Sequence, residues 1–201
     1  MCIRDSFYAN LYDIKQTPKY SMRTLTYHEA TPGHHHQIAH SLENEDLTLY
    51  RRFGYGTSAF SEGWALYAER LALEVGLAND PYDELGILQS EIFRAVRLVV
   101  DTGMHYKRWT REEAMEYMKS KTGMSDTEVR VEIERYIVWP GQALSYKVGM
   151  IKILELRERA MNELGDDFNL KDFHSAVLDH GNPPLLLLAE MIDKMIEDAK
   201  S

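Results

Sequence analysis

Residues 27–37 read Tyr27-His28-Glu29-Ala30-Thr31-Pro32-Gly33-His34-His35-His36-Gln37, and this stretch decides how the rest of the chain is interpreted. It holds four of the eight histidines of the chain within nine positions, with a glutamate directly after the first. Neutral imidazoles are the commonest metal ligands in proteins, and a neighbouring carboxylate can serve as a general base. The stretch therefore predicts a metal centre in which a carboxylate lies beside the ligands.

A third ligand is available further along the chain. Hydrolytic zinc sites use three protein ligands and keep a fourth position open for water, and two His with one Glu is a common set. The segment Ser61-Glu62-Gly63-Trp64 offers Glu62 for this role. Two His, Glu62 and a base at Glu29 are the parts of a zinc hydrolase.

The spacing of the histidines departs from the usual His-Glu-x-x-His form, in which four residues place both imidazoles on one face of a helix. His34 follows His28 by six residues and His35 follows it by seven. On a continuous helix the seven-residue pair would lie about 10.5 Å apart along the axis, which is too far for one zinc with bonds of about 2.0–2.1 Å. The segment Thr31-Pro32-Gly33 interrupts the helix, since proline removes a backbone hydrogen bond and glycine accepts unusual backbone angles. Two residues looped out there would bring His34 back to the position of a second ligand.

Other interpretations of these histidines remain open at this point. The run His34-His35-His36 could be a solvated surface segment that binds metal without catalysis. His35 could itself be the second ligand, or could orient Glu62 or a substrate. His36 and His40 are not expected to bind the metal.

Composition limits the classes of protein and partner. The 201 residues and 44% hydrophobic content suit one globular domain, which we place at residues 1–201. A net charge of −9 argues against nonspecific binding to nucleic acid or to anionic membranes. The single cysteine, Cys2, excludes an internal disulfide framework and a cysteine-based zinc site. No apolar run approaches the roughly 18 residues of a membrane span.

The first residues of the chain do not read like a natural start. Residues 1–6 have no apolar centre of the kind a signal peptide needs, and the metal-site stretch begins only at residue 27. We expect the chain to be the C-terminal part of a longer protein, with residues 1–6 non-native.

The rest of the sequence predicts helices with short connections, and therefore an all-α fold. Thr110 and Ser125 each precede a glutamate by three residues, which is the pattern of a capping box. Only residues 8–14 and 50–57 are ambiguous, and no segment alternates as a strand would. The helices are expected at residues 60–76, 82–102, 110–122, 125–138, 142–164, 170–178 and 184–199.

Four segments together resemble one family, the bacterial domain of unknown function 885 (DUF885). They are residues 26–37, residues 60–69, Arg97-Leu98-Val99-Val100-Asp101-Thr102-Gly103-Met104-His105 and residues 139–146. That family in turn resembles helical zinc peptidases of the thimet oligopeptidase and carboxypeptidase Taq type. Members are generally much longer than this chain, which agrees with the expectation of a C-terminal part.

The resemblance implies a helical, gluzincin-like metallopeptidase catalytic region with zinc as its cofactor and a peptide or related amide as its substrate. It implies His28 as first ligand, Glu29 as base, His34 as second ligand and Glu62 as third ligand. The two extra residues before Gly33 depart from the His-Glu-x-Gly-His helix of those peptidases.

Donors for the oxyanion of the transition state are also needed. Tyr146 is the first candidate, because it resembles a tyrosine that follows a proline-bearing turn in the carboxypeptidase Taq type. His105 is the second, because Asp101 stands one helical turn earlier and could orient its imidazole. Either residue could equally have a purely structural role.

Several further residues have two interpretations. Arg97 and Arg135 could hold a substrate carboxylate or form ordinary salt bridges. Glu69, seven residues after Glu62, could support the metal ligands from behind or be a paired surface charge. Trp64 and Tyr67 are expected in the core, and His174 and His180 have no pattern that assigns them.

Two rival functions stay open. The chain could be a metal-binding domain or pseudoenzyme without hydrolytic activity. It could also be a metal-free helical interaction module, which predicts that the side chains of His28, His34 and Glu62 lie more than about 8 Å apart, given metal–ligand bonds near 2 Å.

Overall fold

The computed structural model describes residues 18–54 and 56–201, and within these ranges the chain contains helices and no strand. The predicted all-α fold is therefore confirmed. The helices in chain order are α1 (Lys19–Glu29), α2 (His34–Glu43), α3 (Leu49–Phe53), α4 (Ser58–Glu74), α5 (Pro81–His105), α6 (Arg111–Thr122), α7 (Asp126–Val138), η2 (Gln142–Leu144), α8 (Ser145–Leu164), η3 (Gly165–Asp167), α9 (Leu170–Leu178) and α10 (Leu185–Ala199).

Local sequence signals set several helix ends, including the two predicted at Thr110 and Ser125. Thr110 and Ser125 form complete capping boxes, each accepting from the backbone amide of a glutamate whose carboxylate accepts in return. Asp80 accepts from the Tyr82 amide at the start of α5, where Pro81 is the first helical residue. Gly123 ends α6 in the left-handed conformation.

Three segments differ from the prediction or lie outside the described residues. The helix expected over residues 142–164 is divided, because η2 is a single tight turn that precedes the α-helix from Ser145. The ambiguous segment at residues 50–57 contains most of the short helix α3, capped by Thr48. Residues 1–6 and the ambiguous segment at residues 8–14 lie outside the described residues.

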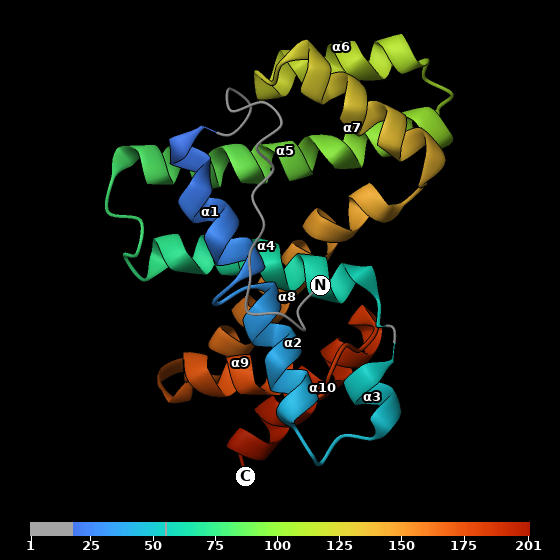
Figure 1. Ribbon diagram of the computed structural model, residues 1–201. Coiled ribbons are helices and arrows are strands. Elements are labelled where there is room, and N and C mark those ends of the chain that lie inside the picture. Colours follow the sequence, from blue (N-terminus) through green and yellow to red (C-terminus); the bar gives the residue numbers. More distant parts are fainter. Residues whose placement is uncertain (1–17, 55) are drawn as a thin grey trace.

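Buried side chains form two hydrophobic clusters. One joins α4 and α8 to α9 and α10, with Phe60, Met150 and Phe173 fully buried. The other joins α5, α6, α7 and η2 around Met118 and Ile133. Figure 1 shows α5, α6 and α7 at one end of the molecule and α9 and α10 at the other, with α4 and α8 between them. Helices α1 and α2 run along one side and contact α4.

Helices α4 and α8 approach each other closely at two glycines. A Cβ atom on Gly149 would lie 1.8 Å from the Ala59 carbonyl oxygen, and one on Gly63 would lie 2.5 Å from the Gly149 backbone. Neither position can therefore carry a side chain without separating the helices. This contact fixes Glu62, next to Gly63, relative to Tyr146 at the start of α8.

The core between α4 and α9 contains a polar pair. The Tyr67 hydroxyl lies 2.7 Å from His174 Nε2, and Arg157 donates to the same hydroxyl. Burial, and after it the positive charge of Arg157, lowers the pKa of His174 to about 4. The imidazole is therefore neutral at pH 7 and can accept a hydrogen bond from the Tyr67 hydroxyl.

This pair predicts a loss of stability in acid. An unfolded histidine has a pKa of about 6.5, so between pH 6.5 and pH 4 the unfolded state binds more protons at His174 than the folded state does. The free energy of unfolding should fall over that range through this group by about 1–2 kcal/mol, less than the full shift implies because solvent screens a partly exposed side chain. Urea denaturation at pH 7 and pH 4.5 measures the loss, and His174→Gln should make it smaller. An equal loss in the variant would assign the acid sensitivity to other groups.

Among the described helices, none has the length and apolar character that crossing a lipid bilayer requires.

Candidate metal centre

The predicted break between His28 and His34 is present and has a steric cause. Helix α1 ends at Glu29, and α2 begins at His34. A Cβ atom on Gly33 would lie 1.9 Å from the carbonyl oxygen of His28, so only glycine fits this close approach. The Trp64 indole donates to the Pro32 carbonyl oxygen at 2.9 Å and ties the turn to α4. The turn between α1 and α2 thus places His34 beside His28.

Three predicted ligands from three helices converge. His28, His34 and Glu62 each offer one ligand atom, and these atoms lie within 4.8 Å of one another. Glu62 Oε2 is 3.2 Å from His34 Nε2 and 3.7 Å from His28 Nε2. The two imidazole rings meet edge to face with their centroids 4.8 Å apart. The separation of more than about 8 Å that the metal-free module requires is not found.

The donor set of this group suits zinc. Two imidazole nitrogens and one carboxylate oxygen are found together in catalytic zinc sites. Bonds of about 2.0–2.1 Å to a tetrahedral ion place two ligand atoms roughly 3.3–3.4 Å apart, close to the two distances from Glu62. The three atoms together spread over 4.8 Å, so the two imidazoles would have to move closer to each other to share one ion.

Glu69 holds His28 from behind. Its Oε1 lies 2.6 Å from His28 Nδ1, and both side chains are almost fully buried. A carboxylate can only accept, so Nδ1 carries the proton and the lone pair of a neutral His28 is left on Nε2, toward Glu62 and His34. Such a carboxylate–histidine pair is the usual support of a metal-binding imidazole. The interpretation of Glu69 as a supporting residue thus agrees with its position.

The charges of the site reinforce one another. Burial acts to lower the pKa of His28, but the hydrogen bonds with Glu62 and Glu69 outweigh it and raise that pKa above the ordinary value. Burial acts to raise the pKa of Glu62, but its contacts with His28 and His34 lower it far below the usual range. Glu62 is therefore an anion at any working pH and can serve as a ligand without losing a proton.

Glu29 and Tyr146, the predicted base and oxyanion donor, both lie near His28. Glu29 is half-buried and directly follows His28 at the end of α1. The ring of Tyr146 stacks on the ring of His28 at a centroid distance of 6.1 Å and an angle of 21°, and its hydroxyl accepts from Gln142. The Tyr146 ring therefore lies beside the candidate ligand His28.

His105 is not brought to this cluster, and its predicted pairing with Asp101 is wrong. Its Nε2 lies 2.9 Å from the carbonyl oxygen of Tyr136, in contact with α7. Asp101 accepts instead from the Gly141 amide at 3.1 Å. His105 also follows Arg97, which contacts the Tyr146 ring, by eight residues, or about 12 Å along the helix. The Asp101 carboxylate thus binds the turn before η2, and the His105 imidazole contacts α7 instead.

The two candidate arginines face the same carboxylate. Arg97 donates to Glu132 at 2.8 Å and lies over the rings of Phe93 and Tyr146. Arg135 lies 3.8 Å from Glu132. The salt-bridge interpretation therefore describes both.

The other histidines lie outside the ligand group. His40 is paired with Asp179 at 2.7 Å, and its ring neighbours that of His36. His35 is half-buried in the first turn of α2 and is not part of the converging group.

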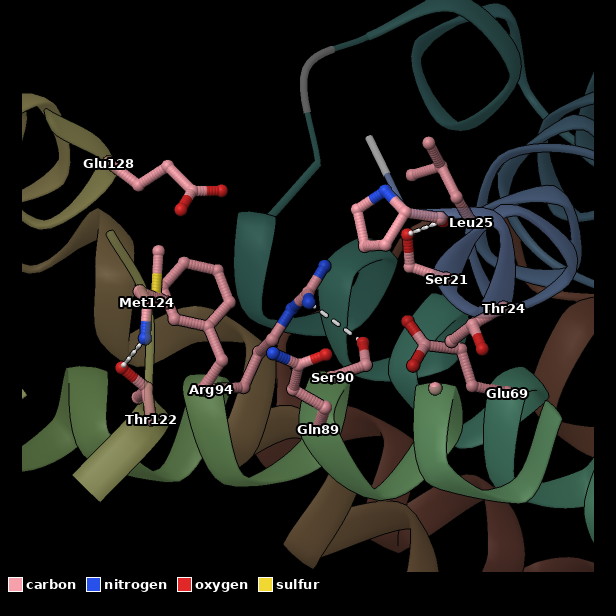
Figure 2. Close-up of a pocket in the computed structure, with 13 residues that line it drawn as sticks. Ser21, Thr24, Leu25, Glu69, Gln89, Ser90, Arg94, Thr122, Met124 and Glu128 are labelled. Atoms are coloured by element: carbon pink, nitrogen blue, oxygen red, sulfur yellow. Dashed lines mark hydrogen bonds between the residues drawn. The ribbon is translucent and has the colours of Figure 1, made fainter. Parts of the chain in front are cut away.

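Sequence reasoning missed one residue near the site. Arg94 of α5 reaches into a pocket of about 210 Å³ between α1, α5 and the start of α7 (Figure 2). Glu69 lines the same pocket, which connects it to the back of His28. No sequence signal places Arg94 there, because its position follows from the packing of α5 on α1 and α8.

No curated protein matches the chain. A crystal structure of a candidate lipoprotein from Colwellia psychrerythraea is 53% identical, with a TM-score of 0.90 over 94% of this chain and 32% of that one. A candidate lipoprotein of unknown function from Shewanella oneidensis is 29% identical, with a TM-score of 0.82 over 89% of this chain and 32% of that one. The chain thus spans about a third of the length of each of these two proteins.

The family model described as bacterial protein of unknown function (DUF885) matches residues 4–192, nearly the whole chain. The matched range includes all four segments on which the resemblance rests. The match is made on the sequence and does not depend on the geometry of the site. The chain belongs to this DUF885 family.

Proposed function

We propose that the chain carries the metal centre of a zinc-dependent peptide hydrolase of helical, gluzincin-like type. The observation that carries the proposal is the convergence of His28, His34 and Glu62, with Glu69 fixing the tautomer of His28 from behind. An isolated surface histidine run would not have a buried carboxylate behind its first member. Bound zinc would polarise a peptide carbonyl and lower the pKa of a water molecule.

The chain's own residues then have separate tasks. His28, His34 and Glu62 hold the ion, and Glu29 accepts the proton of the attacking water and passes it to the leaving amine. The Tyr146 hydroxyl is the candidate donor to the developing oxyanion, since its ring lies against His28. The proposed substrate class is peptides or related amides.

The alternative is a metal-binding domain or pseudoenzyme with the same ligands and no turnover. The two are separated by measuring peptide hydrolysis by the zinc-loaded chain and by its Glu29→Gln variant under the same conditions. Cleavage by the wild type that is lost in the variant supports the hydrolase. Absence of cleavage by either, with zinc bound in both, would support the alternative.

A further inference from the structure

The hydrogen-bond role of the Tyr146 hydroxyl is set by Gln142. Gln142 Nε2 donates to this hydroxyl at 3.4 Å, and Gln142 Oε1 accepts from Arg135 Nη2 at 3.5 Å. An arginine can only donate, so Arg135 takes the amide oxygen and leaves the amide NH2 group for Tyr146. The hydroxyl therefore accepts from Gln142, and its own hydrogen remains available for a second partner.

Arg97 packs against the ring of the same tyrosine. Its Cζ lies 4.7 Å from the Tyr146 ring centroid and 4.2 Å from that of Phe93, and the faces of aromatic rings attract a cation. The side chain is only 4% exposed, and its Nε and Nη1 have no hydrogen-bond partner in the described part of the chain. Its ion pair with Glu132, at 2.8 Å, adds little net stability because desolvation opposes it. Stability alone therefore does not account for a buried arginine at this position.

Two segments that supply no candidate metal ligand meet at Tyr146. They are residues 97–105 of α5 and residues 139–146, which include the turn η2. Asp101 of the first segment accepts from the Gly141 amide of the second at 3.1 Å. Both segments belong to the four on which the family resemblance rests. Their contacts fix the tyrosine relative to α5.

We propose that Arg97 and Gln142 are positioning residues for Tyr146. Arg97 holds the ring beside His28, and Gln142 keeps the hydroxyl hydrogen directed away from itself and available to a substrate oxygen. The inference deepens the proposed hydrolytic function and rests on it for the identity of that oxygen. The direction of the hydrogen bond from Gln142 carries it, because a residue that only filled space could equally well accept from the tyrosine.

The first test observes Tyr146 without turnover, by carbon NMR of the purified chain labelled with 13C at tyrosine Cζ. This carbon bears the hydroxyl, and Tyr146→Phe identifies its resonance. Gln142→Glu keeps the size of the side chain but reverses the hydrogen bond, because a carboxylate can only accept. The Tyr146 resonance should therefore shift in Gln142→Glu. It should also shift in Arg97→Met, and less in Arg97→Lys, which keeps the charge.

Arg111→Gln is the control for these spectra, since Arg111 pairs with Glu134 at the exposed surface. It should leave the Tyr146 resonance in place. An unchanged resonance in folded Gln142→Glu and Arg97→Met would overturn the proposal.

The second test is a double-variant cycle on peptide hydrolysis. Tyr146→Phe should lower kcat by roughly 10²–10³-fold, as loss of an oxyanion donor does. Gln142→Glu should lower kcat by roughly 10²-fold with little change in KM, because the hydroxyl hydrogen is then engaged by the carboxylate. Combined with Tyr146→Phe it should cost less than about twofold more, because both changes remove the same donor.

Losses that multiply in the double variant would overturn the assignment of Gln142. The NMR measurement needs no turnover, so absence of cleavage by the wild type would overturn the proposed function, while the Tyr146 resonance would still decide whether Arg97 and Gln142 hold the tyrosine.

Discussion

Replacing Glu29 with glutamine is expected to leave zinc bound and to lower kcat for peptide hydrolysis by roughly 10²–10⁴-fold. Glutamine has nearly the size of glutamate but cannot accept a proton at working pH, so the loss would report the base and not the shape of the site. Glu29 is not one of the converging ligands, so the metal should stay in place. The measurement is kcat with the zinc content determined on the same preparation.

A matched control distinguishes the base from a general effect of charge. Glu43→Gln at the exposed end of α2 removes the same charge outside the converging ligands and should leave kcat within about twofold, as ordinary surface substitutions do. If Glu29→Gln hydrolysed peptides as fast as the wild type, Glu29 would not be the base, whatever the metal content.

Replacing Glu69 with glutamine is expected to weaken zinc binding by roughly 10–100-fold. The carboxylate accepts from His28 Nδ1 at 2.6 Å, which fixes the ring and makes Nε2 a better donor to the metal. Glutamine can occupy the same space but has no negative charge to stabilise the ligand. Competition against a chromophoric chelator measures the change in zinc affinity at fixed pH.

Glu74 provides the control on the same helix. It is paired with Arg70 and Arg157 near the end of α4, outside the ligand group. Glu74→Gln should therefore keep the zinc affinity of the wild type. Equal affinities for Glu69→Gln and the wild type would mean that the buried carboxylate has only a structural role.

Much of the fold follows from signals that act over a few residues. The capping boxes at Thr110 and Ser125 and the proline at the start of α5 determine helix ends by hydrogen bonds within one turn. The proline and glycine of segment 31–33 likewise predict the break between α1 and α2, because they act on the backbone of their own turn. The short turn η2 was not separated from α8, because Ser145 carries on a helical backbone and leaves no break in the sequence pattern.

The candidate site joins parts that are close in sequence or share a helix face to Glu62, which lies on a separate helix and was named as a ligand through the family resemblance. Glu69 follows Glu62 by two helical turns, and this spacing was enough to suggest its supporting role. The contacts of Asp101, His105 and Arg94 could not be predicted, because each depends on another helix. Asp101 meets the Gly141 turn, His105 meets α7, and Arg94 faces α1 and α8.

The central claim is that His28, His34 and Glu62 bind zinc, and the most direct measurement is the metal content of the purified chain. Elemental analysis should find about one zinc per wild-type chain and per His40→Ala chain, since His40 pairs with Asp179 outside the site. His28→Ala should lose the zinc while keeping its helical circular dichroism. An absence of zinc from the folded wild type, even after zinc is added, or its retention by His28→Ala, would contradict the account.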